Sequence, residues 1–217
     1  MPSSTVENYL KTIYSEQAFN EALVPMGRLA AAMSVSPGTA TSMVQTLAES
    51  GLTDYEPRKG TRLTERGKRL ALHVLRRHRL IELFLVEVLK FDWSDVHTEA
   101  EELEHAISDK VLERIDVLLD HPSVDPHGDP IPTSTGHLND VSGQSLAECE
   151  LGRSLVVMRV LDQDVKFLQF VERHGLTPGV ELVVGNRNPI ADSVTLNPDG
   201  HPSVTVGTAM AQKILVE

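Results

Sequence analysis

A segment rich in proline and glycine divides the chain into two parts with different secondary-structure patterns. Between His121 and Gly143 these residues are Pro122, Pro126, Gly128, Pro130, Pro132, Gly136 and Gly143. Because proline and glycine both disfavour a continuous helix, the segment is predicted to be a loop and linker. Apolar residues recur at helical intervals before it, whereas short runs rich in valine and leucine follow it. We therefore expect an α+β protein with several domains.

The charge of the chain is unevenly distributed along its 217 residues, although the net value is −11. Residues 1–79 hold 11 Lys and Arg against 7 Asp and Glu, whereas residues 80–217 hold 9 against 24. The positive part is therefore expected to form a separate module. Its basic residues favour a surface that faces phosphates, and the plainer alternative is a solvated basic helix.

Two short helices joined by a tight turn are predicted after a first amphipathic helix at residues 5–17. The first covers residues 25–33. The second begins after Ser36, a good N-cap residue, with Pro37 at the first helical position, and it ends at Gly51. This pattern indicates a helix-turn-helix motif. The expected DNA-facing residues of its second helix are Ser36, Pro37, Gly38, Thr39, Thr41, Ser42 and Gln45.

A hairpin is predicted at residues 52–64, with Lys59 and Gly60 at its turn. Such a hairpin would be the wing of a winged helix-turn-helix, in which basic side chains contact phosphates beside the major groove. Its candidates are Arg58, Lys59 and Arg62.

Helical periodicity is strong from Glu65 to about Lys90 and again from about Trp93 to Leu119. The first stretch carries more apolar residues than one packing face needs, which favours a dimerisation element over a core within one chain. After the linker, short strands at residues 155–161, 180–184, 194–196 and 204–206, with a helix near 166–174, predict a five-stranded barrel of about seventy residues.

The chemistry of the chain is concentrated in histidine and glutamate residues at helical spacing. His97, Glu101, Glu104 and His105 would share one helix face, and His78 and Glu82 repeat the i, i+4 spacing. Imidazole and carboxylate ligands without thiolate suit first-row divalent metals. A solvated acidic face is the plainer alternative, but six such residues on two neighbouring helices favour a metal site. His127 is expected to be an ordinary loop residue.

The single cysteine, Cys149, excludes an intramolecular disulfide and a cysteine-rich zinc module. No apolar run of membrane-spanning length occurs, and residues 1–4 lack the pattern of a signal peptide. We expect a cytoplasmic protein without a membrane partner.

The order of these parts resembles the diphtheria toxin repressor and manganese transport regulator family of metal-activated transcription factors. The resemblance covers essentially the whole chain and is carried by residues 6–14, 36–42, 77–80, 101–105 and 125–132. It implies a winged helix-turn-helix domain at 1–72, a helical metal-binding and dimerisation domain at 73–136, a linker at 137–144 and an SH3-like domain at 145–217.

The resemblance also implies two metal sites. The primary site would comprise Asn8, Glu101, Glu104 and His105. The ancillary site would comprise His78, Glu82 and His97, completed by an acceptor from the C-terminal domain among Asp162, Gln163 and Asp164, with Asp164 chosen. Through Asn8, one ion would link the DNA-binding domain to the helices that follow it.

The same resemblance implies a homodimeric repressor that binds a palindromic operator in double-stranded DNA and controls metal-uptake genes. Glu101 stands where iron-responsive members carry cysteine, and this harder oxygen donor favours Mn²⁺ over the alternative, Fe²⁺. We expect no enzyme activity. One rival is a metal-dependent hydrolase or oxidase, which the absence of a second Glu-x-x-His opposes. Another is a transport accessory protein, which leaves the basic wing unexplained.

Overall fold

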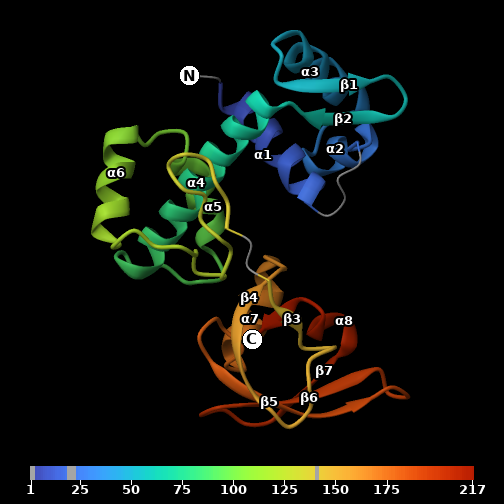
Figure 1. The fold of residues 1–217 in the computed structure, drawn as a ribbon, viewed down its shortest axis with the longest axis vertical. Helices are drawn as coiled ribbons and strands as arrows, with labels where there is room; N and C mark the ends of the chain where they lie inside the picture. Colours follow the sequence, from blue (N-terminus) through green and yellow to red (C-terminus); the bar gives the residue numbers. More distant parts are fainter. Residues whose placement is uncertain (1–2, 19–22, 140–141) are drawn as a thin grey trace. The chain divides into compact units, whose positions relative to one another are not determined.

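The computed structural model, drawn in Figure 1, describes residues 3–18, 23–139 and 142–217. The chain divides into two compact units. One unit comprises residues 1–77 with 132–138, and the other comprises residues 78–131 with 139–217. The helix α4 (Glu65–Glu87) contributes residues to both. Residues 140 and 141 of the predicted linker lie outside the described residues.

The first unit contains the predicted helix-turn-helix. Helix α1 (Ser4–Ala18) is followed by α2 (Met26–Ala32) and α3 (Pro37–Glu49). The side chain of Ser36 accepts a hydrogen bond from the backbone N–H of Thr39 at 3.1 Å, which confirms it as the N-cap of α3. Side chains from all three helices, including Leu10, Leu29 and Leu47, form the core beneath this motif.

The predicted wing is an antiparallel hairpin of β1 (Thr53–Glu56) and β2 (Gly60–Leu63). The chain before α2 joins it, because Val24 and Thr61 exchange backbone hydrogen bonds of 2.7 and 3.0 Å. Gly60 has φ 144°, and a Cβ atom there would lie 2.4 Å from the Val24 carbonyl oxygen. The base of the wing is therefore fixed to the body of the unit.

The prediction of one continuous helix from about Trp93 to Leu119 is wrong. The structure forms α5 (Val96–Leu103) and α6 (Asp109–Leu118) in its place. The break follows from Ser108, whose side chain caps the backbone N–H of Val111 and starts a new helix. Consequently Glu104 lies at the C-cap of α5 and His105 lies beyond it, not within one continuous helix.

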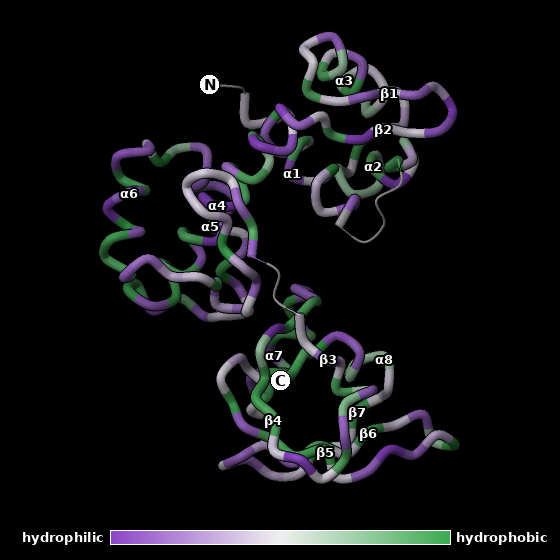
Figure 2. The backbone as a smooth tube through the Cα atoms, in the orientation of Figure 1, coloured by the Kyte–Doolittle hydropathy of each residue, from purple (hydrophilic) through white to green (hydrophobic). Residues whose placement is uncertain are grey.

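Apolar residues of α4, α5 and α6 form a second core that includes Leu80, Ile81 and Leu112. Figure 2 shows hydrophobic and hydrophilic positions alternating along α6, as expected for a helix with one packed face. Several apolar side chains nevertheless remain exposed in this part of the chain, namely Val88, Leu89, Phe91, Val111, Val117 and Leu118.

The described C-terminal residues form a small barrel, but its one sheet has six strands, in the order β3-β8-β4-β5-β6-β7, where five were predicted. Its strands are β3 (Gln144–Ser145), β4 (Ser154–Val160), β5 (Glu181–Asn188), β6 (Ser193–Pro198), β7 (Val204–Gly207) and β8 (Ile214–Val216), with helices α7 (Val165–Arg173) and α8 (Thr208–Ala211). The strands β3 and β8 were not predicted, because they are too short to show a periodic pattern. The α+β fold class is confirmed.

No helix in the described ranges has the length and apolarity needed to span a bilayer.

The close approach of α4 to Leu52, the residue before β1, generates a stability prediction. A Cβ atom at Gly67 would lie 2.0 Å from the Leu52 carbonyl oxygen, so Gly67→Ala should destabilise the protein by about 1–3 kcal/mol. The matched control is Gly27→Ala in α2, where a Cβ atom would meet nothing within 4 Å and the change should stay within about 1 kcal/mol. Urea unfolding measures both, and equal effects would contradict the packing described here.

Candidate functional site

The middle of α4 places His78 and Glu82 on one face of the helix, as the i, i+4 spacing predicts. Both residues are buried, with 4% and 0% of their surfaces exposed. Buried ionisable side chains are costly unless other polar groups compensate them. The groups around these two residues therefore define the site.

Two imidazoles and one carboxylate meet beside α4. His78 Nε2 lies 2.8 Å from Glu82 Oε1 and 3.0 Å from His97 Nδ1, and the distance from His97 Nδ1 to Glu82 Oε1 is 3.1 Å. Burial alone would raise the pKa of Glu82. The charge of His78 and hydrogen bonds with His78 and His97 outweigh burial and hold this pKa below its ordinary value.

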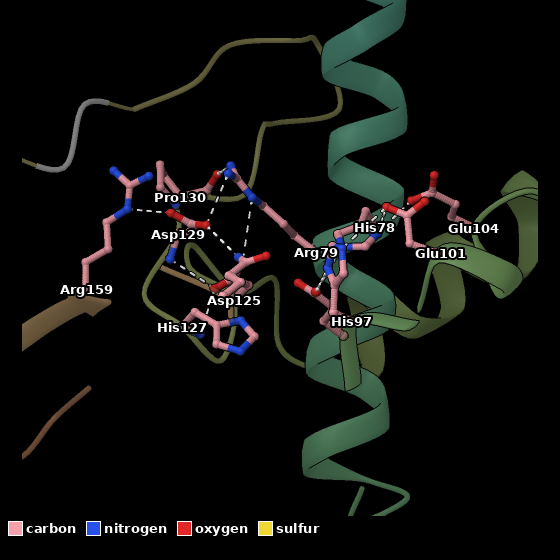
Figure 3. Close-up of polar contacts among 12 residues, drawn as sticks. His78, Arg79, His97, Glu101, Glu104, Asp125, His127, Asp129, Pro130 and Arg159 are labelled. Carbon is pink, nitrogen blue, oxygen red and sulfur yellow. Dashed lines mark hydrogen bonds and ion pairs between the residues drawn. The ribbon is translucent and has the colours of Figure 1, made fainter. Parts of the chain in front are cut away.

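The end of α5 brings further carboxylates to the same histidine (Figure 3). His78 Nδ1 lies 2.7 Å from Glu104 Oε2, and Glu104 is fully buried. Glu101 Oε1 is 3.9 Å from His78 Nδ1 and 3.7 Å from His97 Nε2, while His105 Nε2 is 3.3 Å from Glu104 Oε1. One atom each of His78, His97 and Glu101 lies within 4.8 Å of the others, a spacing that a metal ion can bridge.

A second group with ligand spacing consists of Glu82, Asp125 and His127, all of them buried. Their ligand atoms also lie within 4.8 Å of one another. Among the described residues, Glu82 Oε2, Asp125 Oδ2 and His127 Nδ1 are buried without a hydrogen-bond partner. Three such atoms on three clustered residues fit a divalent cation, which would satisfy all of them together.

Hydrogen bonds between the Asp125 side chain and backbone N–H groups stabilise the turn that carries Asp125 and His127. Asp125 Oδ1 accepts hydrogen bonds from the backbone N–H groups of His127 and Asp129, at 2.8 and 2.9 Å. Burial, followed by the charges of Asp129 and Glu82, raises the pKa of Asp125 well above its ordinary value. Burial lowers the pKa of His127 and so favours the neutral ring, the form that binds metals.

Sequence reasoning missed Asp125 and His127. It treated His127 as an ordinary loop residue, whereas the structure buries it completely and brings it to Glu82. The available signal was the Asp-Pro-His run at residues 125–127, because a carboxylate and an imidazole two residues apart can project from one turn. Helical spacing could not reveal it, since the turn lies 43 positions beyond Glu82 in the chain.

The other predicted ligands lie elsewhere or stay predictions. Asp164 accepts hydrogen bonds from the backbone of Lys166 and Phe167 and caps α7, Asp162 pairs with Lys213, and Gln163 donates to Asp129. Their predicted place beside His78, Glu82 and His97 therefore stays a prediction. Asn8 lies on α1 in the first unit, and its role as a ligand with Glu101, Glu104 and His105 also stays a prediction.

The predicted DNA-facing residues lie at the start of α3 and along it. The exposed residues are Ser36, Pro37, Gly38, Thr39, Ser42 and Gln45, whereas Thr41 is half-buried and its hydroxyl donates to the Pro37 carbonyl oxygen at 2.8 Å. In the wing, Lys59 pairs with Glu56 at 2.8 Å and Arg62 with Asp54 at 3.2 Å. Arg58 is exposed, with φ 66°, in the turn of the hairpin.

Three family models match consecutive parts of this chain. The N-terminal DNA-binding domain of iron-dependent repressors matches residues 1–61, and their metal-binding and dimerisation domain matches residues 64–133. The FeoA domain matches residues 144–217.

Individual relatives match nearly the full length. The iron-dependent repressor IdeR of Mycobacterium tuberculosis is 31% identical over 226 residues, covering 98% of this chain and 96% of the relative. The diphtheria toxin repressor of Corynebacterium glutamicum is 31% identical over 194 residues, covering 84% of each. A solved manganese-dependent transcriptional repressor in complex with manganese has a TM-score of 0.87 at 38% identity, covering 97% of this chain and 98% of its own. ScaR with bound Zn²⁺ has a TM-score of 0.78 at 33% identity, covering 100% and 99%.

The second cluster predicts a cation-binding step that depends on His127. His127→Ala removes the imidazole from Glu82 and Asp125, so isothermal titration with Mn²⁺ should lose one binding step. The matched control is His121→Ala, which removes an exposed imidazole from outside the cluster and should leave all steps in place. An unchanged titration of His127→Ala would exclude this cluster as a cation site.

Proposed function

The chain belongs to the iron-dependent repressor family, and from this premise we propose that it represses transcription when a divalent cation binds to the clusters around α4. We propose Mn²⁺ as the physiological cation, with Fe²⁺ as the alternative, and the control of metal-uptake genes as the biological role. In this proposal residues 1–72 bind DNA, residues 73–136 bind the cation and pair two chains, and residues 145–217 form the accessory barrel.

One observation carries this proposal. A winged helix-turn-helix with an exposed polar α3 leads directly into α4, which carries two buried residues of a carboxylate and imidazole cluster. A DNA-binding domain does not need such a cluster for its own stability, because its core is apolar. The cluster is therefore best explained as the sensor that controls the DNA-binding domain.

The donor set supports manganese. The proposed ligands are carboxylate oxygens and imidazole nitrogens, and the buried Cys149 belongs to the core of the barrel. Oxygen-rich sites without thiolate suit Mn²⁺ better than softer metals. The cation, when bound, would supply positive charge that stabilises the ionised forms of buried Glu82, Glu104 and Asp125.

Recognition of DNA would combine α3 and the wing. The exposed hydroxyl and amide groups of Thr39, Ser42 and Gln45 can hydrogen-bond to base edges and phosphates. The basic side chains of the wing would contact the phosphate backbone beside the groove. A homodimer would present two such modules to a palindromic operator. The exposed apolar residues around α4 and α6 provide surface for that pairing.

Catalysis has no comparable support. The relatives named above are repressors, and nothing in them favours the hydrolase or oxidase alternative. We propose that the chain is not an enzyme and that it acts in the cytoplasm, where its DNA target would lie.

Metal dependence of DNA binding tests the function. A duplex selected from a random pool by the full chain in Mn²⁺ should bind at least tenfold more tightly with Mn²⁺ than with excess chelator, as measured by fluorescence anisotropy. Glu104→Gln removes a buried charge from the cluster and should abolish this difference. The control is Glu102→Gln, an exposed neighbour, which should keep it. Equal binding with and without the cation in the wild type would refute the proposal.

The wing generates a second prediction through the salt dependence of binding. Arg58→Asn removes one positive charge and retains a residue type that tolerates positive φ. The slope of log affinity against log salt concentration should fall by about 1, with weakening that is similar for different sequences. Lys110→Asn, an exposed change on α6 in the other unit, serves as the control. An unchanged slope for Arg58→Asn would remove this residue from the interface.

A further inference from the structure

The turn that carries Asp125 and His127 also contacts the C-terminal barrel. The backbone N–H of Val160 in β4 donates to the His127 carbonyl oxygen at 2.9 Å. Gly128 has φ 84°, and a Cβ atom there would lie 1.9 Å from the Met158 carbonyl oxygen. The turn therefore packs directly on the backbone of β4, with no side chain between them.

Asp129 lies between two arginines from different elements of the same unit (Figure 3). Its carboxylate forms an ion pair with Arg159 of β4 and accepts a hydrogen bond from Gln163 at 3.2 Å. Arg79 of α4 lies 3.5 Å from Asp129 Oδ2 and also 3.5 Å from Asp125 Oδ2. Arg79 thus forms ion pairs with both carboxylates of the turn, whereas the ion pair of Arg159 among the described residues is with Asp129.

The backbone of Asp129 connects the ion pair with Arg159 to Asp125, a residue of the cation cluster. Its N–H donates to Asp125 Oδ1, and its carbonyl oxygen accepts from the Asp125 N–H at 2.9 Å. Because Asp125 Oδ1 accepts the hydrogen bonds within the turn, the direction in which Asp125 Oδ2 points depends on the position of the turn. Outer residues that fix the orientation of a ligand affect the metal affinity of the site.

We propose that Arg159 is a positioning residue for the Glu82–Asp125–His127 cation centre and that it acts through Asp129. The C-terminal barrel thereby sets the affinity of a centre whose ligands all lie outside the barrel. This inference rests on the proposed function only in assuming that the centre binds a cation.

A purely electrostatic role makes the opposite prediction. Arg159 carries a positive charge beside the buried Asp129, so its removal would make the surroundings of the centre more negative and strengthen cation binding. If Arg159 instead positions the turn, its removal frees Asp129 from β4 and leaves Arg79 to neutralise two carboxylates. Asp125 Oδ2 is then held less firmly, and cation binding weakens. The sign of the change distinguishes the two roles.

Coupling between the barrel and the centre must act in both directions. If the contact with β4 strengthens cation binding, cation binding strengthens the contact by the same factor. The hydrogen bond from Val160 to His127 reports on that contact. Mn²⁺ should therefore slow hydrogen exchange of the Val160 amide in the wild type.

The test is Mn²⁺ titration of the full-length chain by calorimetry, with the step that His127→Ala removes assigned to this centre. Arg159→Gln should weaken that step about tenfold. The affinity of any binding step that Glu101→Gln removes should change by no more than about twofold in Arg159→Gln. Arg159→Lys keeps the positive charge but loses the planar guanidinium, so it should give an intermediate affinity. This second variant keeps the test decisive if Arg159→Gln fails to fold. The control is Arg153→Gln, which removes the same charge from an exposed position just before β4 and should change nothing.

The outcomes separate this inference from the proposed function. Unchanged or tighter binding by Arg159→Gln at the His127-dependent step would overturn the positioning role while leaving the cation centre intact. Loss of both binding steps to the same extent would also overturn it, because that result indicates a general folding effect. If the wild type has no step that His127→Ala removes, both the centre and the role of Arg159 are refuted.

Discussion

The second unit depends on the neutralisation of buried carboxylates. Glu82, Glu104 and Asp125 are almost inaccessible to solvent, and Asp129 is nearly so. Isolated charges at such positions would be too costly to keep, so each is surrounded by imidazole, guanidinium or backbone N–H groups. Because those groups come from α4, α5, the turn at residues 125–129 and β4, satisfying the acids also determines how these segments pack.

The two clusters are chemically linked because they share residues. Glu82 contacts His78 and His97 through one oxygen and belongs to the group with Asp125 and His127 as well. His78 in turn bonds to both Glu82 and Glu104 through its two ring nitrogens. The structure therefore brings one residue of the predicted ancillary site, His78, into direct contact with one residue of the predicted primary site, Glu104.

The sequence was most informative where function depends on local spacing. The N-cap at Ser36, the wing around Gly60 and the i, i+4 pair in α4 each depend on residues a few positions apart, and the structure has all three. The break between α5 and α6 was missed because apolar periodicity continued across it, while the capping signal of Ser108 was a single side chain. Asp125 and His127 were missed because their proximity to Glu82 arises from tertiary folding of a turn without periodicity.

The attachment of the wing to Val24 limits how the first unit can adapt to a duplex. Backbone pairing with Thr61 and the close approach at Gly60 hold the stem of the hairpin against the chain before α2. Only the tip at residues 57–59 lies beyond this anchor. DNA sites that differ in groove width would have to be accommodated by side chains at that tip or by deformation of the DNA itself. Such an interface would favour duplexes whose shape already matches its spacing, so base steps outside direct contact would contribute to selectivity.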